Sequence, residues 1–315
     1  MNATELNKML NGPDLSPLQK KLRGKKNLPL SVQNATTPEV ELRRLVKEHR
    51  ALTQQAVGLE HKATPHERED GTVVLPKFAG DTCNELKAFA KVLRKKADGL
   101  KVQMLRELRQ IDVYQHFLKH VYGCGPVTAA YIVATIDVEV KEPLASTKPS
   151  ALVQFCGLGV ANGRLSRLEK GETRKFCAHM RSTIFSMFQS MSKERGLHGK
   201  TSKYMDIWDA TKGRLLQDAR VSDGRIKTEA GKDFTAKAHA HAAGWHVAAR
   251  VFLEDLYVIW RTLKGLPVWP SYYAGKLGYG HMGKIVVNEP KLLTLDEAKA
   301  LVGNVGGVLV EAAAE

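Results

Sequence analysis

Hydrophobic positions spaced alternately by three and four residues dominate the first third of the chain and predict two long helices. The first helix is expected to begin at residue 38, and its narrow apolar stripe consists of Leu42, Leu45, His49, Leu52, Ala56 and Leu59. The second is expected from about residue 84 to 121, with ten of its eleven heptad positions apolar or aromatic. Two such helices predict an antiparallel coiled-coil hairpin, or a hairpin that also dimerises.

Local signals support these limits. Thr37 is placed to cap the first helix, and Pro38 suits its first position. Gly99 weakens the middle of the second helix by about 1 kcal/mol relative to alanine. Residues 1–37 show no sustained period and are rich in Lys, Pro, Asn and Gly. They are therefore expected to form a basic flexible arm.

Shorter elements are expected after residue 121. Gly123, Gly125 and Pro126 open a short helix of mostly small residues from Thr128 to Ile136. Free backbone N–H groups at such a helix start suit a phosphate, although the same glycines also let two backbones pack closely. Both interpretations of the glycine turn stay open at this point.

Little strand is predicted in the rest of the chain. It is expected only near Thr72 to Leu75 and in a basic hairpin near Arg164 to Arg174. A strong helix ends in a basic last turn with Gly265 as its stop. The fold class is therefore mainly α, with four predicted parts: a basic arm (1–37), the coiled-coil hairpin (38–121), a helical nucleic-acid-binding domain with a small basic β-hairpin (122–280) and an acidic tail (281–315).

The charge of the chain indicates a polyanionic partner. Lys and Arg number 48 against 33 acidic residues, which gives a formal net charge of +15. The excess is uneven, because residues 148–232 hold 17 basic and 8 acidic side chains. A membrane surface is less favoured, since the basic residues fall in a loop-rich stretch and not on an amphipathic helix. Nucleic acid is the expected partner, with an acidic protein as the remaining alternative.

The candidate nucleic-acid contacts combine basic residues, one aromatic residue and the glycine turn. They are Gly123, Gly125, Thr128, Arg164, Arg167, Lys170, Arg174, Lys175, Arg181, Lys200, Lys203, Tyr204, Lys212 and Arg214. The basic side chains are expected to contact phosphates, which sets affinity with little sequence preference. The outside of the second long helix carries eight more basic residues, which leave a role along nucleic acid open: Lys87, Lys91, Arg94, Lys95, Lys96, Lys101, Arg106 and Arg109.

The sequence gives little support for a metal site, a catalytic site or a bound cofactor. Three histidines at spacings of two and five do not share one helix face, so no metal site is expected at His239, His241 and His246. Four acidic residues lie in separate segments without a nuclease motif: Asp137, Glu139, Asp206 and Asp209. No P-loop or complete dinucleotide fingerprint occurs, so no nucleotide cofactor is expected.

The compartment is expected to be cytoplasmic. No run of about 18 apolar residues occurs, so no transmembrane helix is predicted. The four cysteines, Cys83, Cys124, Cys156 and Cys177, lie too far apart for a metal motif and are expected to be free thiols in a reducing compartment.

Several segments in one order carry a resemblance to known proteins. After the predicted coiled coil come GCGPVTAAYIVATI, ALVQFCGL, a basic hairpin, MRSTIF and AHAAGWHVAARVFLEDLYVIWR. This order, over residues 38–265, resembles the C-terminal half of bridge-RNA-guided insertion-sequence transposases and Piv-type invertases. It is also similar to the Nop-type domain of box C/D ribonucleoproteins and to the Nop-like Tas proteins of TIGR systems in phages and bacteria. The resemblance implies a Nop-like domain over 122–280 and a small guide RNA as partner.

The chain differs from these families at the metal ligands and the nucleophile that carry out their chemistry. The transposases carry a RuvC-like domain with four acidic metal ligands, whereas residues 1–37 contain only Glu5 and Asp14. Their nucleophilic serine corresponds here to Asn162, which cannot attack a phosphodiester, and Ser166 lies nearby but off register.

Two functions are therefore predicted. The first is an RNA-guided DNA-recognition protein without its own nuclease domain, dimerised through the coiled coil. The alternative is a divergent DNA-binding transposase or nuclease that acts alone or with a catalytic partner.

Overall fold

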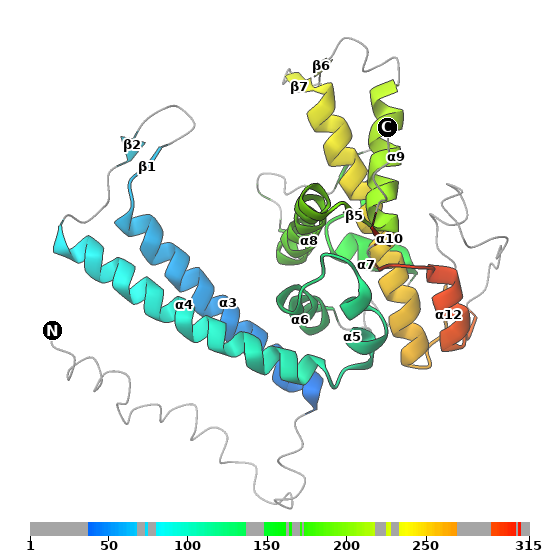
Figure 1. The fold of residues 1–315 in the computed structure, drawn as a ribbon, viewed down its shortest axis with the longest axis horizontal. Coiled ribbons are helices and arrows are strands. Elements are labelled where there is room, and N and C mark those ends of the chain that lie inside the picture. Colours follow the sequence, from blue (N-terminus) through cyan, green and yellow to red (C-terminus); the bar gives the residue numbers. More distant parts are fainter. Residues whose placement is uncertain are drawn as a thin grey trace, which may run out of the picture. The chain divides into compact units, whose positions relative to one another are not determined.

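The structure is a computed structural model, and its described part is mainly helical, as the sequence predicts (Figure 1). Residues Pro38–Glu315 form one compact unit. The structure describes residues 37–67, 73–74, 80–136, 148–161, 164–165, 171, 173–217, 225–227, 233–269, 291–306 and 308–309. Apart from Thr37, the predicted basic arm lies outside the described residues.

Nine α-helices and one 3-10 helix make up most of the described chain. They are α3 (Pro38–Ala63), α4 (Asp81–Leu108), α5 (Asp112–His116), η1 (Leu118–His120), α6 (Pro126–Thr135), α7 (Pro149–Phe155), α8 (Ala178–His198), α9 (Lys203–Gln217), α10 (Ala236–Leu263) and α12 (Leu295–Val302). The predicted helix start at Pro38 is confirmed. The predicted glycine stop is confirmed as well, because Gly265 has φ +64° directly after α10.

The strands within the described residues are short, and they form only two-stranded antiparallel sheets. The pairs are β1 (His66–Glu67) with β2 (Val73–Val74), β3 (Val160–Ala161) with β4 (Arg164–Leu165), β5 (Lys200–Thr201) with β8 (Val308–Leu309), and β6 (Arg225–Lys227) with β7 (Asp233–Thr235). Most of the residues that would extend the β3–β4 pair toward Arg174 lie outside the described residues. The longer basic hairpin therefore stays a prediction.

Helices α3 and α4 lie side by side and antiparallel. Of the predicted stripe on α3, Leu42, Leu45, His49 and Ala56 are buried, while Leu52 and Leu59 are partly buried. The Arg94 guanidinium of α4 contacts the Glu60 carboxylate of α3 at 2.5 Å. The helical spacing in the sequence thus identified the buried faces, and a coiled coil with regular knobs-into-holes packing stays a prediction.

The prediction of one continuous helix from 84 to 121 is wrong. Helix α4 ends at Leu108, and Ile111 is extended with φ −105° and ψ 122° before α5 begins. Since α3 begins at Pro38 and runs antiparallel to α4, it offers no partner surface much beyond Leu108. The apolar residues that follow pack into the central core instead, where Phe117 stacks on Phe252 at 6.0 Å. Burial against another part of the chain overrode the heptad pattern.

Helix α10 is the centre of the described fold. It contacts α5, α7, α8, α9 and α12. Every residue from Ala248 to Arg261 is buried, including the four charged residues Arg250, Glu254, Asp255 and Arg261. One hydrophobic core joins this helix to α3 and α4, so the core extends across the predicted domain limit at residue 121.

The α3–α4 hairpin is tied to the core through a polar contact as well. The Nδ1 of His49 lies 2.9 Å from the Tyr131 hydroxyl of α6, and the Tyr131 ring lies 4.9 Å from that of His179 in α8. Burial lowers the pKa of both histidines, so both rings are neutral near pH 7. A neutral imidazole can stay in this largely apolar contact between three helices.

Candidate nucleic-acid interface

Two arginines lie around an aromatic ring just ahead of α8. The guanidinium groups of Arg174 and Arg181 lie 5.9 and 6.0 Å from the centre of the Phe176 ring. Arg174 and Lys175 are exposed, whereas Phe176 and Arg181 are half-buried. Cation–π attraction at this distance favours the arrangement. The segment therefore presents positive charge at a defined aromatic surface.

This segment is fixed in place by the end of α7. The Cys177 N–H donates to the Phe155 carbonyl at 2.7 Å. The Phe176 ring packs directly on Gly157, where an added Cβ would lie 2.5 Å from Phe176 Cδ2. Gly157 also has φ +71°, a left-handed conformation that disfavours other residues. Only glycine lets the ring approach this closely.

More aromatic side chains follow where α8 meets α10. Phe185 lies 5.0 Å from Trp245, and Trp245 lies 4.0 Å from His246, measured between ring centres. Burial, reinforced by the charges of Arg181 and Arg250, lowers the pKa of His246 to about 3. This imidazole is therefore neutral at physiological pH. We call the set Arg174, Phe176, Arg181, Phe185, Trp245 and His246 the α8–α10 cluster.

The glycine turn ahead of α6 serves close packing in the structure. Gly123 has φ +79°, and an added Cβ would lie 2.4 Å from Met191 Cγ of α8. The structure thus supports close packing as the role of Gly123 and does not support the predicted phosphate contact. Gly125 is the N-cap of α6 with no other atom near its missing Cβ, and Thr128 is half-buried in the same helix.

The prediction of a nucleic-acid contact is wrong for Tyr204. This side chain is fully buried, and its hydroxyl donates to Asp255 of α10 at 2.8 Å. Lys203 is also turned inward, since its ammonium contacts the same carboxylate at 2.6 Å. The sequence around Lys203 and Tyr204 gave no sign of this buried carboxylate, because Asp255 lies 51 residues after Tyr204 in the chain.

The remaining predicted contacts are distributed over several elements. Lys212 lines a pocket between α9 and α10 with Lys237, and Arg214 is exposed on α9. The backbones of Arg164 in β4 and Lys200 in β5 are described without their side chains, and Arg167 and Lys170 lie outside the described residues. The structure thus brings Arg174 and Arg181 together and leaves Lys212 and Arg214 on a different helix.

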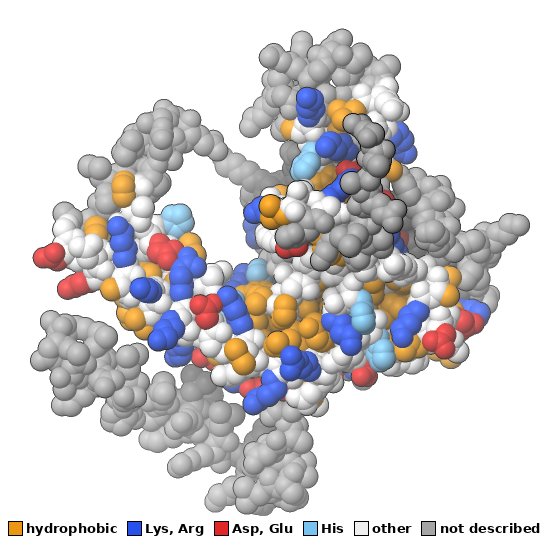
Figure 2. Space-filling model, in the orientation of Figure 1, with side chains coloured by type: hydrophobic (Ala, Val, Ile, Leu, Met, Phe, Trp, Pro, Cys, Tyr) orange, Lys and Arg blue, Asp and Glu red, His pale blue; other side chains and the backbone are white. Residues whose placement is uncertain are grey.

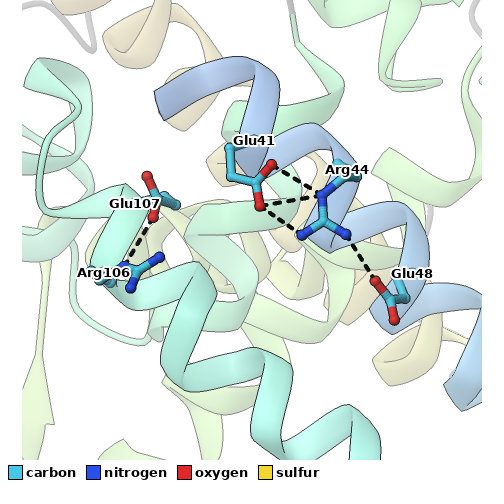
Figure 3. Close-up of polar contacts among 5 residues, drawn as sticks. All are labelled: Glu41, Arg44, Glu48, Arg106 and Glu107. Atoms are coloured by element: carbon cyan, nitrogen blue, oxygen red, sulfur yellow. Dashed lines mark hydrogen bonds and ion pairs between the residues drawn. The ribbon is translucent and has the colours of Figure 1, made fainter. Parts of the chain in front are cut away.

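The basic face predicted on the second helix is partly neutralised. Arg94, Lys101 and Arg106 pair with Glu60, Asp98 and Glu107, and on α3 Arg44 lies between Glu41 and Glu48 (Figure 3). Lys87, Lys91 and Lys95 are exposed and form no ion pair with a described residue. Their spacing of four places them along one side of α4. Figure 2 shows Lys and Arg side chains along the hairpin, with fewer acidic ones among them.

Within the described residues no group of three His, Cys, Asp or Glu side chains is arranged to hold a metal ion. Asp209 pairs with Arg195, and Asp206 accepts a hydrogen bond from the Thr201 hydroxyl at 2.8 Å. Asp137 and Glu139 lie outside the described residues. The two described carboxylates therefore already have partners of their own.

Sequence reasoning missed the aromatic members of the α8–α10 cluster, and of the five residues that line the pocket it predicted only Lys212 as a nucleic-acid contact. Phe176 stands directly after Arg174 and Lys175, a local signal that could have identified it. Trp245 and Lys237 carried no such signal, because their neighbours come from other helices.

Comparison with known protein families, characterised proteins and solved structures found no match for this chain. Among the described residues, no helix is long and apolar enough to cross a membrane.

Proposed function

We propose that this protein binds a small guide RNA and recognises DNA through base pairing of that RNA. The observation that carries the proposal is the α8–α10 cluster, in which Arg174 and Arg181 flank the Phe176 ring. Proteins hold single-stranded nucleic acid with basic groups along the phosphates and aromatic faces against the bases. The cluster combines both kinds of group, and its two arginines lie within the stretch with the largest positive excess, residues 148–232.

The guide-RNA part of the proposal comes from the ordered motifs that resemble bridge-RNA transposases and Nop-type proteins. In this proposal α6 to α10 act as a Nop-like RNA-binding domain, extended by a basic hairpin beyond β3 and β4. The α3–α4 hairpin acts as a coiled coil that joins two copies. Exposed apolar side chains on α4 support such a contact, since Val92 and Val102 are 61% and 72% exposed.

The first test is the nucleic acid that the protein retains when purified from its host. A discrete small RNA supports the proposal, and sequencing identifies it. A protein that retains no RNA and binds none added to it contradicts the proposal. Cutting of DNA that depends on Mg²⁺ favours the alternative, a DNA-binding transposase.

The second test removes the cluster's charge. Arg174→Ala with Arg181→Ala should weaken RNA binding by about tenfold or more and lower the salt slope by roughly two. The charge-matched control is Lys47→Ala with Lys299→Ala, two exposed lysines on α3 and α12 without an ion pair to a described residue. Phe176→Leu should keep most of the packing on Gly157 and lose base stacking, so affinity falls while the salt slope stays constant. Equal binding by all variants would show that the cluster is only a solvated surface.

A further inference from the structure

Helices α9 and α10 pack tightly where Trp208 meets Gly244. An added Cβ on Gly244 would lie 2.4 Å from Trp208 Cδ1 and 2.8 Å from the Trp208 carbonyl oxygen. The Trp208 Nε1–H donates to the His241 carbonyl at 3.1 Å, which fixes the indole against α10. Since Tyr204 pairs with Asp255 and Trp208 with His241, the two helices are antiparallel.

A pocket lies next to this close contact, toward the C-terminal end of α9. Its volume is about 590 Å³, within the range of small-ligand sites. Lys212 and Leu216 follow Trp208 by one and two helical turns, and Lys237, Ala238 and His241 come from the start of α10. The pocket thus opens where the helices are no longer held together by Trp208 and Gly244.

The lining has two different chemical parts. Lys212 and Lys237 line the pocket mainly with their aliphatic stems and bring two positive charges to it, and neither forms an ion pair with a described residue. Leu216 and Ala238 supply an apolar surface, with Leu216 38% exposed. The five lining residues include no carboxylate. An anion is favoured near the lysines, and a flat apolar group is favoured on the Leu216 side.

His241, the fifth lining residue, adds an aromatic ring to the apolar part of the lining. The His241 ring lies 4.8 Å from the Trp208 ring. Burial, and then the charge of Lys212, lowers the pKa of His241. The imidazole is therefore neutral near pH 7. In this form it can stack on a base or form a hydrogen bond with it, and it adds no charge to those of Lys212 and Lys237.

We propose that the pocket between α9 and α10 binds one nucleoside monophosphate unit, supplied by an unpaired nucleotide of the bound RNA. Its phosphate lies between Lys212 and Lys237, and its base lies over Leu216, Ala238 and His241. Stacking of a base on such a surface tolerates any sequence. This inference rests on the proposed RNA binding, and it adds a specific site to it.

The test uses the full-length protein stripped of nucleic acid by high salt. A short single-stranded RNA is the main probe, and adenosine monophosphate and adenosine are the small probes. Lys212→Ala with Lys237→Ala should weaken RNA binding by about tenfold and lower the salt slope by about two. Leu216→Ala should weaken RNA binding with an unchanged slope. Lys47→Ala with Lys299→Ala should match the wild type, and all variants should keep its melting temperature.

A second measurement locates the nucleotide directly. RNA carrying 4-thiouridine should crosslink on irradiation to a peptide that contains Leu216 or His241. Adenosine monophosphate should quench tryptophan fluorescence in the wild type, through Trp208, and not in the double lysine variant. Adenosine should bind more weakly, because it lacks the phosphate.

The outcomes separate this inference from the proposed function. RNA binding that the lysine substitutions leave unchanged, together with a loss in the Arg174→Ala and Arg181→Ala variant, overturns the pocket assignment and leaves RNA binding intact. If the wild type binds adenosine monophosphate but no RNA, the proposed function fails and an RNA source for the nucleotide is overturned with it.

Discussion

Gly244 of α10 lies directly against the indole of Trp208 in α9, where an added Cβ would lie 2.4 Å from Trp208 Cδ1. Trp208 is only 3% exposed and also packs near Phe188 of α8 at 6.1 Å. The indole therefore has little room to move away. This contact joins α8, α9 and α10 at the edge of the α9–α10 pocket.

Gly244→Ala should therefore destabilise the fold even though alanine favours helices. The methyl group overpacks the contact, and we expect a loss of about 1–3 kcal/mol in the free energy of unfolding. Gly99→Ala is the matched control, because nothing lies within 4 Å of its added Cβ in α4. That change should stabilise by up to about 1 kcal/mol. Urea unfolding of both variants checks the prediction, and a stabilising Gly244→Ala would contradict it.

Acid should weaken the fold through His246. Its pKa is lowered to about 3 in the folded protein, so below pH 6.5 the unfolded chain binds a proton that the folded chain does not. Stability from this residue is present above pH 6.5 and is lost as the pH falls toward 3. The loss is at most about 1.4 kcal/mol per pH unit. Urea unfolding at pH 7 and pH 5 should show a smaller decrease for His246→Gln than for the wild type, and equal decreases would refute this.

Tyr131→Phe should loosen the contact of α3 with α6. The change leaves His49 Nδ1 without its hydroxyl partner in a buried site, at a cost of about 1–2 kcal/mol. Tyr114→Phe is the control, because the Tyr114 hydroxyl forms no hydrogen bond with a described residue. Adding His49→Leu to Tyr131→Phe removes both polar partners and should recover part of the loss. Thermal unfolding tests the series, and a double variant less stable than Tyr131→Phe alone would argue against it.

The isolated protein should neither cut nor join DNA. Metal-dependent cleavage needs carboxylates placed around one or two metal ions, and Asp206 and Asp209 already bind Thr201 and Arg195. Supercoiled plasmid incubated with the protein, its RNA and Mg²⁺ or Mn²⁺ should stay intact. Nicked product that disappears on replacing Asp206, Asp209 or Ser166 would place the protein among the enzymes.

The sequence alone determined the helical class, the start of α3, the end of α10 and the buried faces of the hairpin. These features depend on neighbours within a few residues, through helical spacing, a proline at the first position and a glycine stop. The sequence also located Arg174 and Arg181, because clustered positive charge is visible without knowing the fold.

Only the tertiary structure decided what depends on contacts between distant segments. Helix α4 ends at Leu108 because its apolar continuation is buried against α10, although the heptad pattern continues. Tyr204 was predicted to contact nucleic acid, but it is buried and its hydroxyl donates to Asp255 of α10. The α9–α10 pocket exists because Gly244 admits Trp208 at one level and the helices separate beyond it. Periodicity records which face of a helix is apolar, and it carries no information on which partner covers that face.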